Sequence, residues 1–376
     1  EGFLSQANDT ISLRIDADNL NTAFINKKLG AYLDNVRGTA SGLVHLRGSW
    51  RFVDLYGAVA LDCSTRIKAT NATYTFMGDT LRFTKGTLRF ENARLRDKDG
   101  NSGILSGTVN HNYLSQWACG LYIEFEDFLV YDTPNFGSLP FYGTVYGKGY
   151  AQLKSDGKGL SLSANIVNSP NSKFIYNSSD IGGVRDNSFV TFVDNSKIEE
   201  TSTTTTFGSI YNSVSDVSSK LNLDFLLDLN DSFKLRVYTN MRTDDYIDIY
   251  GNGTIHAIYD DKAGFSMKGN LALDRGTYKF TIQDIFPKEF NIERGSTLHF
   301  SGDPFSAALN LKTKYLIPSV SLSDLTTSST TRNTVKVNCL MNITGTLKSP
   351  VLNFDLELPE GSEEERELLA SIASTP

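Results

Sequence analysis

The strongest constraint on the fold is a regular alternation of apolar and polar residues between positions 268 and 304. In this stretch Leu271 and Leu273 flank Ala272, and the same period of two recurs on both sides of His299. Successive side chains of a β-strand point to opposite faces of the sheet. The pattern therefore predicts strands that each have one apolar face and one polar face.

Short polar segments that end in or contain glycine separate the alternating runs, at 274–276 and 293–295. Glycine adopts a positive φ without steric cost, so we expect both segments to be hairpin turns of an antiparallel meander. A looser copy of this plan begins at Thr73, with turns expected at 77–79 and 84–86. The copy has no fixed period, which indicates repeated hairpins and not a strict solenoid repeat.

Two segments break the period of two. Residues 22–34 repeat their apolar side chains near a period of 3.6, so we expect a short helix there. Ser362 precedes Glu365 by three residues, the spacing of a capping box, which predicts that residues 361–376 begin a second short helix. The fold expected from these patterns is all-β with two short helices.

The domain organisation expected from the sequence is simple. The 376 residues would accommodate two or three ordinary domains, but no segment resembles a boundary between two cores. We therefore expect residues 1–376 to form a single elongated β domain. The Ser/Thr-rich segment 177–219 is expected to be a flexible insertion, because it has little apolar surface to bury. The chain starts without Met or a signal segment, so we expect it to be a fragment of a longer protein.

Composition and spacing argue against several function classes. The net charge is -7 and no run is rich in Lys or Arg, so nucleic acid is not an expected partner. The three cysteines and four histidines have no metal-binding spacing, and an odd number of cysteines cannot form a complete disulfide framework. No metal or other cofactor is expected. No apolar run is long enough to predict a transmembrane helix.

No set of residues has the spacing of a catalytic site. The sequence contains no nucleophile elbow, phosphate loop, dinucleotide fingerprint or metal-binding helix. Residues 97–101 resemble part of a calcium loop but lack its distal acidic ligand, so a solvated hairpin turn is expected instead. Glu124 and Glu126 share the polar face of an expected strand, where carboxylates are solvated. We therefore expect a protein that is not an enzyme.

The order of motifs in the second half of the chain is similar to that of a known family. Residues 277–304 contain TYKF, FNI, GS and LHFSGDP, and residues 342–359 contain NITGTLKSP, NFDL and LP. Together these motifs resemble the C-terminal region of the TamB family, the translocation and assembly module subunits of Gram-negative envelopes. That family is related to the AsmA-like bridge proteins. The resemblance extends from about Leu221 to the C-terminus.

The resemblance implies an elongated, curved antiparallel sheet, open like a taco or a β-solenoid, whose concave apolar face shelters phospholipid acyl chains. It implies phospholipid transport between the inner and outer membranes, or outer-membrane protein assembly and secretion with an Omp85-type, TamA-like barrel partner. The full-length protein would lie in the periplasm and reach the outer membrane. It would be anchored in the inner membrane by an N-terminal segment that lies outside this chain.

The side chains expected to line this groove share the apolar face of the alternating strands. They are Leu271, Leu273, Tyr278, Phe280, Ile282, Phe290, Ile292, Leu298, Phe300, Leu309, Leu311, Val337, Met341, Phe354 and Leu356.

The alternative is a closed β-sandwich or β-helix that serves as a scaffold or adhesion module without lipid cargo. Two tightly packed layers alternate large and small residues across their interface. This chain keeps large apolar residues in every strand, which favours the groove.

Overall fold

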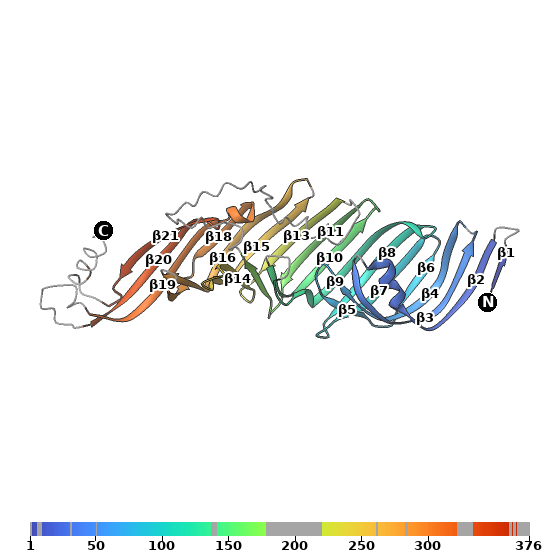
Figure 1. Ribbon diagram of the computed structural model, residues 1–376, viewed down its shortest axis with the longest axis horizontal. Helices are drawn as coiled ribbons and strands as arrows, with labels where there is room; N and C mark the ends of the chain where they lie inside the picture. Colours follow the sequence, from blue (N-terminus) through green and yellow to red (C-terminus); the bar gives the residue numbers. More distant parts are fainter. Residues whose placement is uncertain are drawn as a thin grey trace, which may run out of the picture. The chain divides into compact units, whose positions relative to one another are not determined.

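The computed structural model describes residues 2–5, 10–30, 32–49, 51–136, 141–177, 220–260, 262–282, 285–321, 334–360, 363 and 366. The fold is nearly all β, with 78% strand and 4% helix, and its large mixed sheet does not close into a barrel. Figure 1 shows the strands in chain order from blue to red. The predicted all-β, groove-like class is confirmed.

The first half of the chain supplies eleven strands among the described residues. They are β1 (Gly2–Ser5), β2 (Thr10–Asn21), β3 (Leu33–Gly48), β4 (Val53–Ile67), β5 (Thr73–Phe76), β6 (Asp79–Thr84), β7 (Thr87–Asp97), β8 (Ser102–Asn112), β9 (Ser115–Thr133), β10 (Phe141–Ser155) and β11 (Gly159–Asn168). A 3-10 turn η1 (Thr22–Phe24) and a short helix α1 (Ile25–Leu29) lie between β2 and β3.

The rest of the chain continues in the same way. Its described strands are β12 (Lys173–Asn177), β13 (Lys220–Leu229), β14 (Lys234–Asn240), β15 (Asp245–Asp260), β16 (Gly264–Ile282), β17 (Phe286–Ile292), β18 (Ser296–Gly302), β19 (Ala308–Ser321), β20 (Thr334–Thr346) and β21 (Ser349–Glu357). A 3-10 turn η2 (Pro304–Ser306) joins β18 to β19.

The chain divides into two compact units. Unit 1 comprises Glu1–Phe174, Thr201–Asp228 and His256–Ser266, and unit 2 comprises Ile175–Glu200, Leu229–Ile255 and Met267–Pro376. The single elongated domain 1–376 stays a prediction. The expected insertion 177–219 lies outside the described residues except for Asn177, and the expected helix 361–376 does so except for Glu363 and Arg366.

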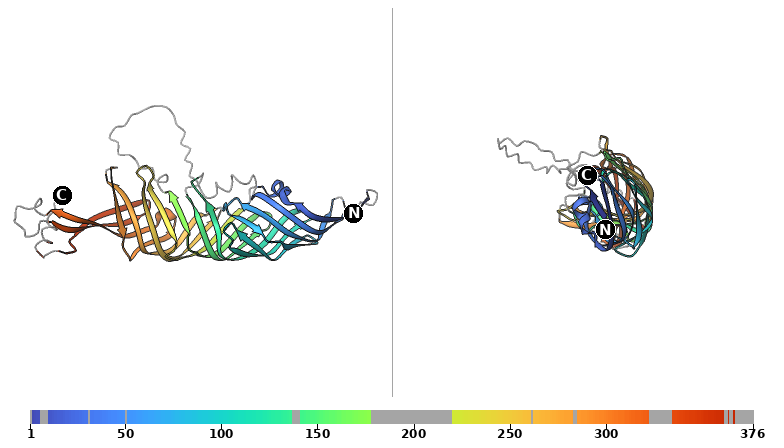
Figure 2. Two further views of the ribbon diagram at one scale, coloured as in Figure 1. Left: turned by 90° about the horizontal axis from the view of Figure 1, so that it is seen from below. Right: turned by 90° about the vertical axis from the view of Figure 1, so that its right-hand side faces the viewer.

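Unit 1 is an antiparallel meander from β1 to β11, in which each strand pairs with the next one except that β5 and β6 both lie between β4 and β7. Figure 2 shows that these blue to green strands are curved. The antiparallel order expected from the sequence changes at β13, which pairs with β11 in parallel from Gly159 opposite Lys220 onward. The sheet is therefore mixed and not purely antiparallel.

The turn expected at 77–79 is a bulge. β5 and β6 both pair with β4 on one side and with β7 on the other, so they are two parts of one interrupted strand. Gly78 has a φ of +77°, a conformation that suits glycine in a bulge as well as in a turn. By contrast, the turn expected at 84–86 is confirmed, because Thr84 pairs with Thr87 across a tight loop.

In unit 2 two strands again pair with the same neighbours on both sides, and neither of the other two expected turns is present. β16 runs without interruption through 274–276, pairing first with β18 and then with β17. The segment 293–295 is a bulge between β17 and β18, which both also pair with β19. Gly295 has a φ of +89° there. The predicted hairpins are thus wrong at both sites. The similarity between the two parts of the sequence does correspond to a similar strand arrangement, with β5 and β6 in unit 1 and β17 and β18 in unit 2.

The helix predicted over 22–34 exists but is shorter. It consists of η1 and α1 and ends at Leu29, and β3 begins at Leu33. Within this segment the Asn26 side chain donates to the Val36 carbonyl and accepts from the Val36 amide, both at 2.9 Å. The side-chain amide of Asn26 thereby pairs with the Val36 backbone, as a neighbouring strand would. The chain enters strand β3 at Leu33, earlier than the apolar period of residues 22–34 predicts.

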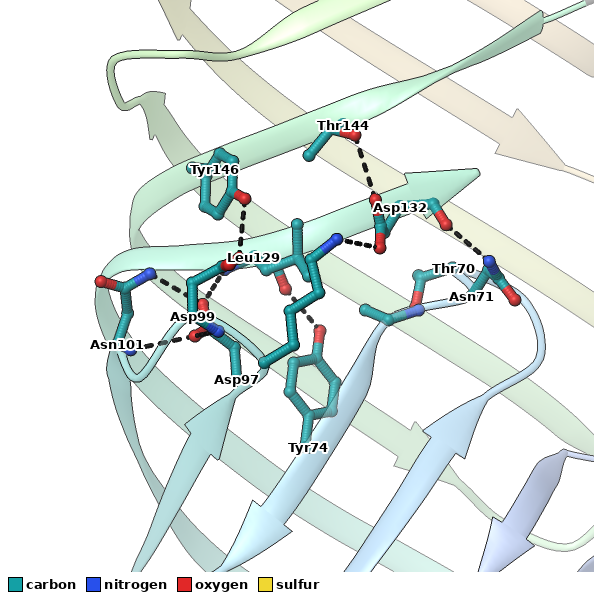
Figure 3. Close-up of polar contacts among 12 residues, drawn as sticks. Thr70, Asn71, Tyr74, Asp97, Asp99, Asn101, Leu129, Asp132, Thr144 and Tyr146 are labelled. Atoms are coloured by element: carbon teal, nitrogen blue, oxygen red, sulfur yellow. Dashed lines mark hydrogen bonds and ion pairs between the residues drawn. The ribbon is translucent and has the colours of Figure 1, made fainter. Parts of the chain in front are cut away.

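The loop at 97–101 is a hairpin turn between β7 and β8, as expected, but its first carboxylate is not solvated. Asp97 is buried, and its carboxylate accepts hydrogen bonds from the backbone amides of Asp99, Asn101 and Leu129, each at 2.9 Å. Figure 3 shows this network beside Tyr146, whose hydroxyl donates to Asp99 at 2.7 Å. The loop is fixed by these bonds to β9 and β10.

Candidate functional site

The apolar face of unit 2 begins with a row of directly paired residues. Leu271 of β16 lies opposite Leu298 of β18, and Leu298 lies opposite Leu309 of β19. Residues paired across neighbouring strands point to the same side of a sheet. All three side chains are buried, so this row forms one continuous apolar band across three strands.

Further rows continue the same face across β19, β20 and β21. Ile343 of β20 lies between Leu311 and Leu352, and Met341 lies between Thr313 and Phe354. Met341 is fully buried, whereas Phe354 on β21 is 55% exposed. The apolar face thus runs from a covered centre to an open edge.

The structure places the predicted groove residues on strands of unit 2 and separates them by burial. The buried members are Leu271, Leu273, Tyr278, Phe290, Ile292, Leu298, Phe300, Leu309, Leu311, Val337 and Met341. Phe280 and Leu356 are half-buried, and Phe354 is exposed. Ile282 lies in β16, but its side chain lies outside what the structure describes.

The covered part of the face is filled by its own side chains. A hollow beside Leu271 and Leu273 offers about 10 Å³, roughly the room that one water molecule needs. Burial also raises the pKa of Tyr278 to about 12, as expected for a phenol in a dry environment. An acyl chain therefore reaches the centre of this face only by displacing side chains.

Residues that the sequence reasoning missed complete the wall of this hollow. They are Leu229, Phe233, Leu235 and Ile249. Leu235 and Ile249 are paired across β14 and β15. The alternation of Ile247 and Ile249 with polar residues was present in the sequence and would have placed β15 on the same apolar face.

The opposite face of unit 2 carries ion pairs and aromatic rings. Arg236 binds the Asp248 carboxylate with two hydrogen bonds, at 2.6 and 2.7 Å, and Lys234 lies 2.8 Å from the same carboxylate. The Arg236 guanidinium also lies 3.8 Å from the ring centroid of Tyr246. Charged and apolar side chains are therefore segregated to the two faces of the sheet.

These contacts change the proton affinities of the paired groups. Burial tends to raise the pKa of Asp248, but hydrogen bonds from Arg236 and Lys234 outweigh it and hold the pKa below its usual value. The hydrogen bonds that Arg236 donates to Asp248 raise the pKa of Arg236 in turn. Both groups stay charged at neutral pH and serve as a structural pair.

A polar hollow of about 500 Å³ lies in unit 1 beside α1. Its wall includes Asp34 and Arg66, which form an ion pair with each other, and the nearby Lys68. The Arg66 hydrogen bond lowers the pKa of Asp34. An ion pair therefore lies in the wall of this hollow, and within the described residues no group of His, Cys, Asp or Glu side chains there could hold a metal ion.

Other site types are not found within the described ranges. In this part of the chain no group of His, Cys, Asp or Glu side chains is arranged to hold a metal ion. The helices that the structure describes are too short and too polar for one of them to cross a membrane. Glu124 and Glu126 are exposed, which confirms the solvated positions expected for them.

A family model for the TamB C-terminal domain matches residues 91–374. The chain belongs to the TamB family. TamB proteins are envelope proteins of the translocation and assembly module, which contributes to outer-membrane biogenesis. They are non-enzymatic bridge and assembly proteins that act with TamA-type partners in general. No curated protein sequence matches this chain closely enough to show a further relationship.

Proposed function

We propose that this TamB domain shelters phospholipid acyl chains on the apolar face of unit 2 and serves phospholipid transport between the inner and outer membranes. The observation that carries the proposal is the series of mainly apolar paired rows that together extend from β16 through β18, β19 and β20 to the edge strand β21. At the edge the face is open, because Phe354 is exposed beside the fully buried Met341. A soluble protein rarely leaves such a face open without a ligand or a partner.

Acyl chains fit this face for a simple energetic reason. Each methylene group that leaves water contributes about 0.8 kcal/mol, so even half of an acyl chain outweighs the displacement of a few surface side chains. The first contacts would be the exposed Phe354 and the half-buried Leu356 on β21, and the half-buried Phe280 on β16. The buried residues behind them would line the path only when the strands separate.

The family membership supports the rest of the proposal. The protein would lie in the periplasm, anchored in the inner membrane by a segment outside this chain, and reach the outer membrane. There it would act with an Omp85-type, TamA-like barrel protein in the assembly and secretion of outer-membrane proteins. The opposite face, which carries the paired Arg236 and Asp248, would lie outside the lipid path.

Site-specific photo-crosslinking tests the lipid proposal. A crosslinker placed at Phe280 or Phe354 in cells is expected to capture phospholipid. Crosslinkers at Lys279 and His299, whose positions alternate with the apolar ones, are the matched controls and are expected to capture none. Equal capture from both faces would contradict a directed apolar path.

A second candidate is a scaffold or adhesion module without lipid cargo. The filled interior at Leu271 and Leu273 favours it, since a permanent groove would leave more space there. The two candidates differ at the edge strand. A scaffold predicts that protein is captured at Phe354 and that no position on the face captures lipid.

A further inference from the structure

Hairpin loops at one end of the unit 1 strands expose aromatic side chains beside cationic ones. Because the meander alternates direction, the loop with Arg51 and Phe52, the loops 85–86, 113–114 and 156–158, and the first residues of β9 up to Trp117 lie at the same end of their strands. We call these four loops, together with residues 115–117 of β9, the aromatic rim. Phe52 is 56% exposed and Trp117 is 45% exposed, and Tyr113 and Leu114 are exposed between them.

The four loops of the aromatic rim are physically joined. The rings of Phe52 and Tyr113 meet edge to face, with centroids 5.0 Å apart. Gly157 lies against the backbone carbonyl of Trp117, which brings the fourth loop beside the third. The aromatic residues therefore form one patch and are not scattered single exposures.

Buried polar groups hold this patch in place. The Asp54 carboxylate accepts a hydrogen bond from the Gly86 amide at 2.9 Å. His111, whose side chain is fully buried, accepts from the Leu114 amide at 3.1 Å, and its ring lies 5.0 Å from that of Trp117. Because these groups fix the loops, the aromatic side chains cannot easily fold back onto the sheet.

The charges of the aromatic rim are mainly positive. Arg51, Lys85 and Lys158 are exposed, and none of the three forms an ion pair among the described residues. The one acidic side chain in these loops, Asp156, accepts hydrogen bonds from the amides of Lys158 and Gly159. Exposed aromatic rings beside unpaired cations match the interface of a bilayer that contains anionic lipids.

We propose that the aromatic rim of unit 1 binds the surface of a membrane with anionic phospholipid headgroups. Phe52, Tyr113 and Trp117 would enter the headgroup region, and Arg51, Lys85 and Lys158 would attract the lipid phosphates. This surface lies in unit 1 and uses none of the residues of the apolar face of unit 2. A test of membrane binding by the aromatic rim is therefore independent of a test of the proposed lipid path.

The two tryptophans of the chain make the proposal measurable. Trp50 and Trp117 are the only two, so a Trp50→Phe variant leaves Trp117 as the single fluorescent reporter. Vesicles of phosphatidylcholine and phosphatidylglycerol are expected to shift its emission to shorter wavelength. Brominated acyl chains in the same vesicles are expected to quench it. A Trp117 signal unchanged by the vesicles would overturn the proposal.

Paired variants separate the apolar and the electrostatic contributions. Replacing Phe52 and Tyr113 together by Ser is expected to weaken vesicle binding by about tenfold or more. Arg51→Glu with Lys85→Glu is expected to abolish the preference for anionic over neutral vesicles. The control is Tyr150→Ser, which removes an equally exposed aromatic side chain from the middle of β10 and is expected to leave binding unchanged. An equal loss in the control would overturn the proposal.

Other occupants give different results. If the aromatic rim instead joins two copies of the chain, the Phe52 and Tyr113 variant would dissociate a dimer in the absence of vesicles, as light scattering would show. If the Trp117 emission shifts on mixing with a protein partner but not with vesicles, the aromatic rim binds protein and the membrane proposal is overturned. Crosslinking of lipid at Phe280 should be the same in all these variants, so failure here and failure of the unit 2 proposal are distinguishable.

Discussion

Removing the Asp97 carboxylate should destabilise unit 1 by an amount that its hydrogen bonds determine. In Asp97→Ala the buried Leu129 amide loses the carboxylate oxygen that accepts its hydrogen bond, which costs about 1–3 kcal/mol. The amides of Asp99 and Asn101 and the side-chain amide of Asn101 lie in a surface loop and regain water, so each of these three lost bonds costs well under about 1 kcal/mol. We expect the free energy of unfolding to fall by about 3 kcal/mol in total.

Urea unfolding followed by tryptophan fluorescence measures this loss in unit 1 alone, because Trp50 and Trp117 both belong to that unit. The transition midpoint is expected to fall by about 1 M, for a denaturant dependence of about 3 kcal/mol per molar. The matched control is Asp99→Ala, which removes one exposed hydrogen bond from Tyr146 and should cost less than about 1 kcal/mol. Equal midpoints for the wild type and Asp97→Ala, or an equal loss in Asp99→Ala, would refute the reasoning.

Three further predictions concern ionisable groups. Hydrogen bonds from Arg236 and Lys234 hold the pKa of Asp248 below its usual value, so the stability that this carboxylate contributes is present above about pH 4 and is lost as the pH falls below that value. When acid titration is followed by circular dichroism, Asp248→Asn should therefore lose less stability than the wild type over this pH range. Burial raises the pKa of Cys63, so in the native protein this thiol should react with a thiol reagent far more slowly than in urea; fast native labelling would contradict its burial. Glu124→Ala and His299→Ala should leave outer-membrane integrity near the wild-type level, as measured by detergent sensitivity, and a loss of function with an intact fold would reveal a missed active site.

The strands could be predicted from the sequence because a period of two is a local property. Leu271, Leu273, Leu298 and Phe300 all lie on the buried face that their alternation indicates. The segments 274–276 and 293–295 were assigned wrongly for a physical reason. A glycine beside charged residues is compatible with a turn, a bulge or a continuing strand, and the choice is made by strands distant in sequence that pair on either side.

The sequence alone could also not predict which parts of the apolar face are buried and which are exposed. Alternation states which side chains of a strand are apolar, but the burial of Met341 and the exposure of Phe354 depend on their positions in the sheet. Both residues carry the same local pattern. The edge position of β21 decides that Phe354 is open. For the same reason, the buried contacts of His111 and Asp54 with the aromatic rim left no recognisable pattern in the sequence.

The most direct test of the lipid path is the phospholipid content of the protein after gentle purification from a Gram-negative host, measured by native mass spectrometry. The account predicts bound phospholipid on the wild type, and on a Lys279→Ala control whose change lies on the opposite face. It predicts that Phe280→Asp, which places a charge on the apolar path, stays folded but loses most of this lipid. A folded wild type without phospholipid, or a Phe280→Asp variant that retains all of it, would contradict the account.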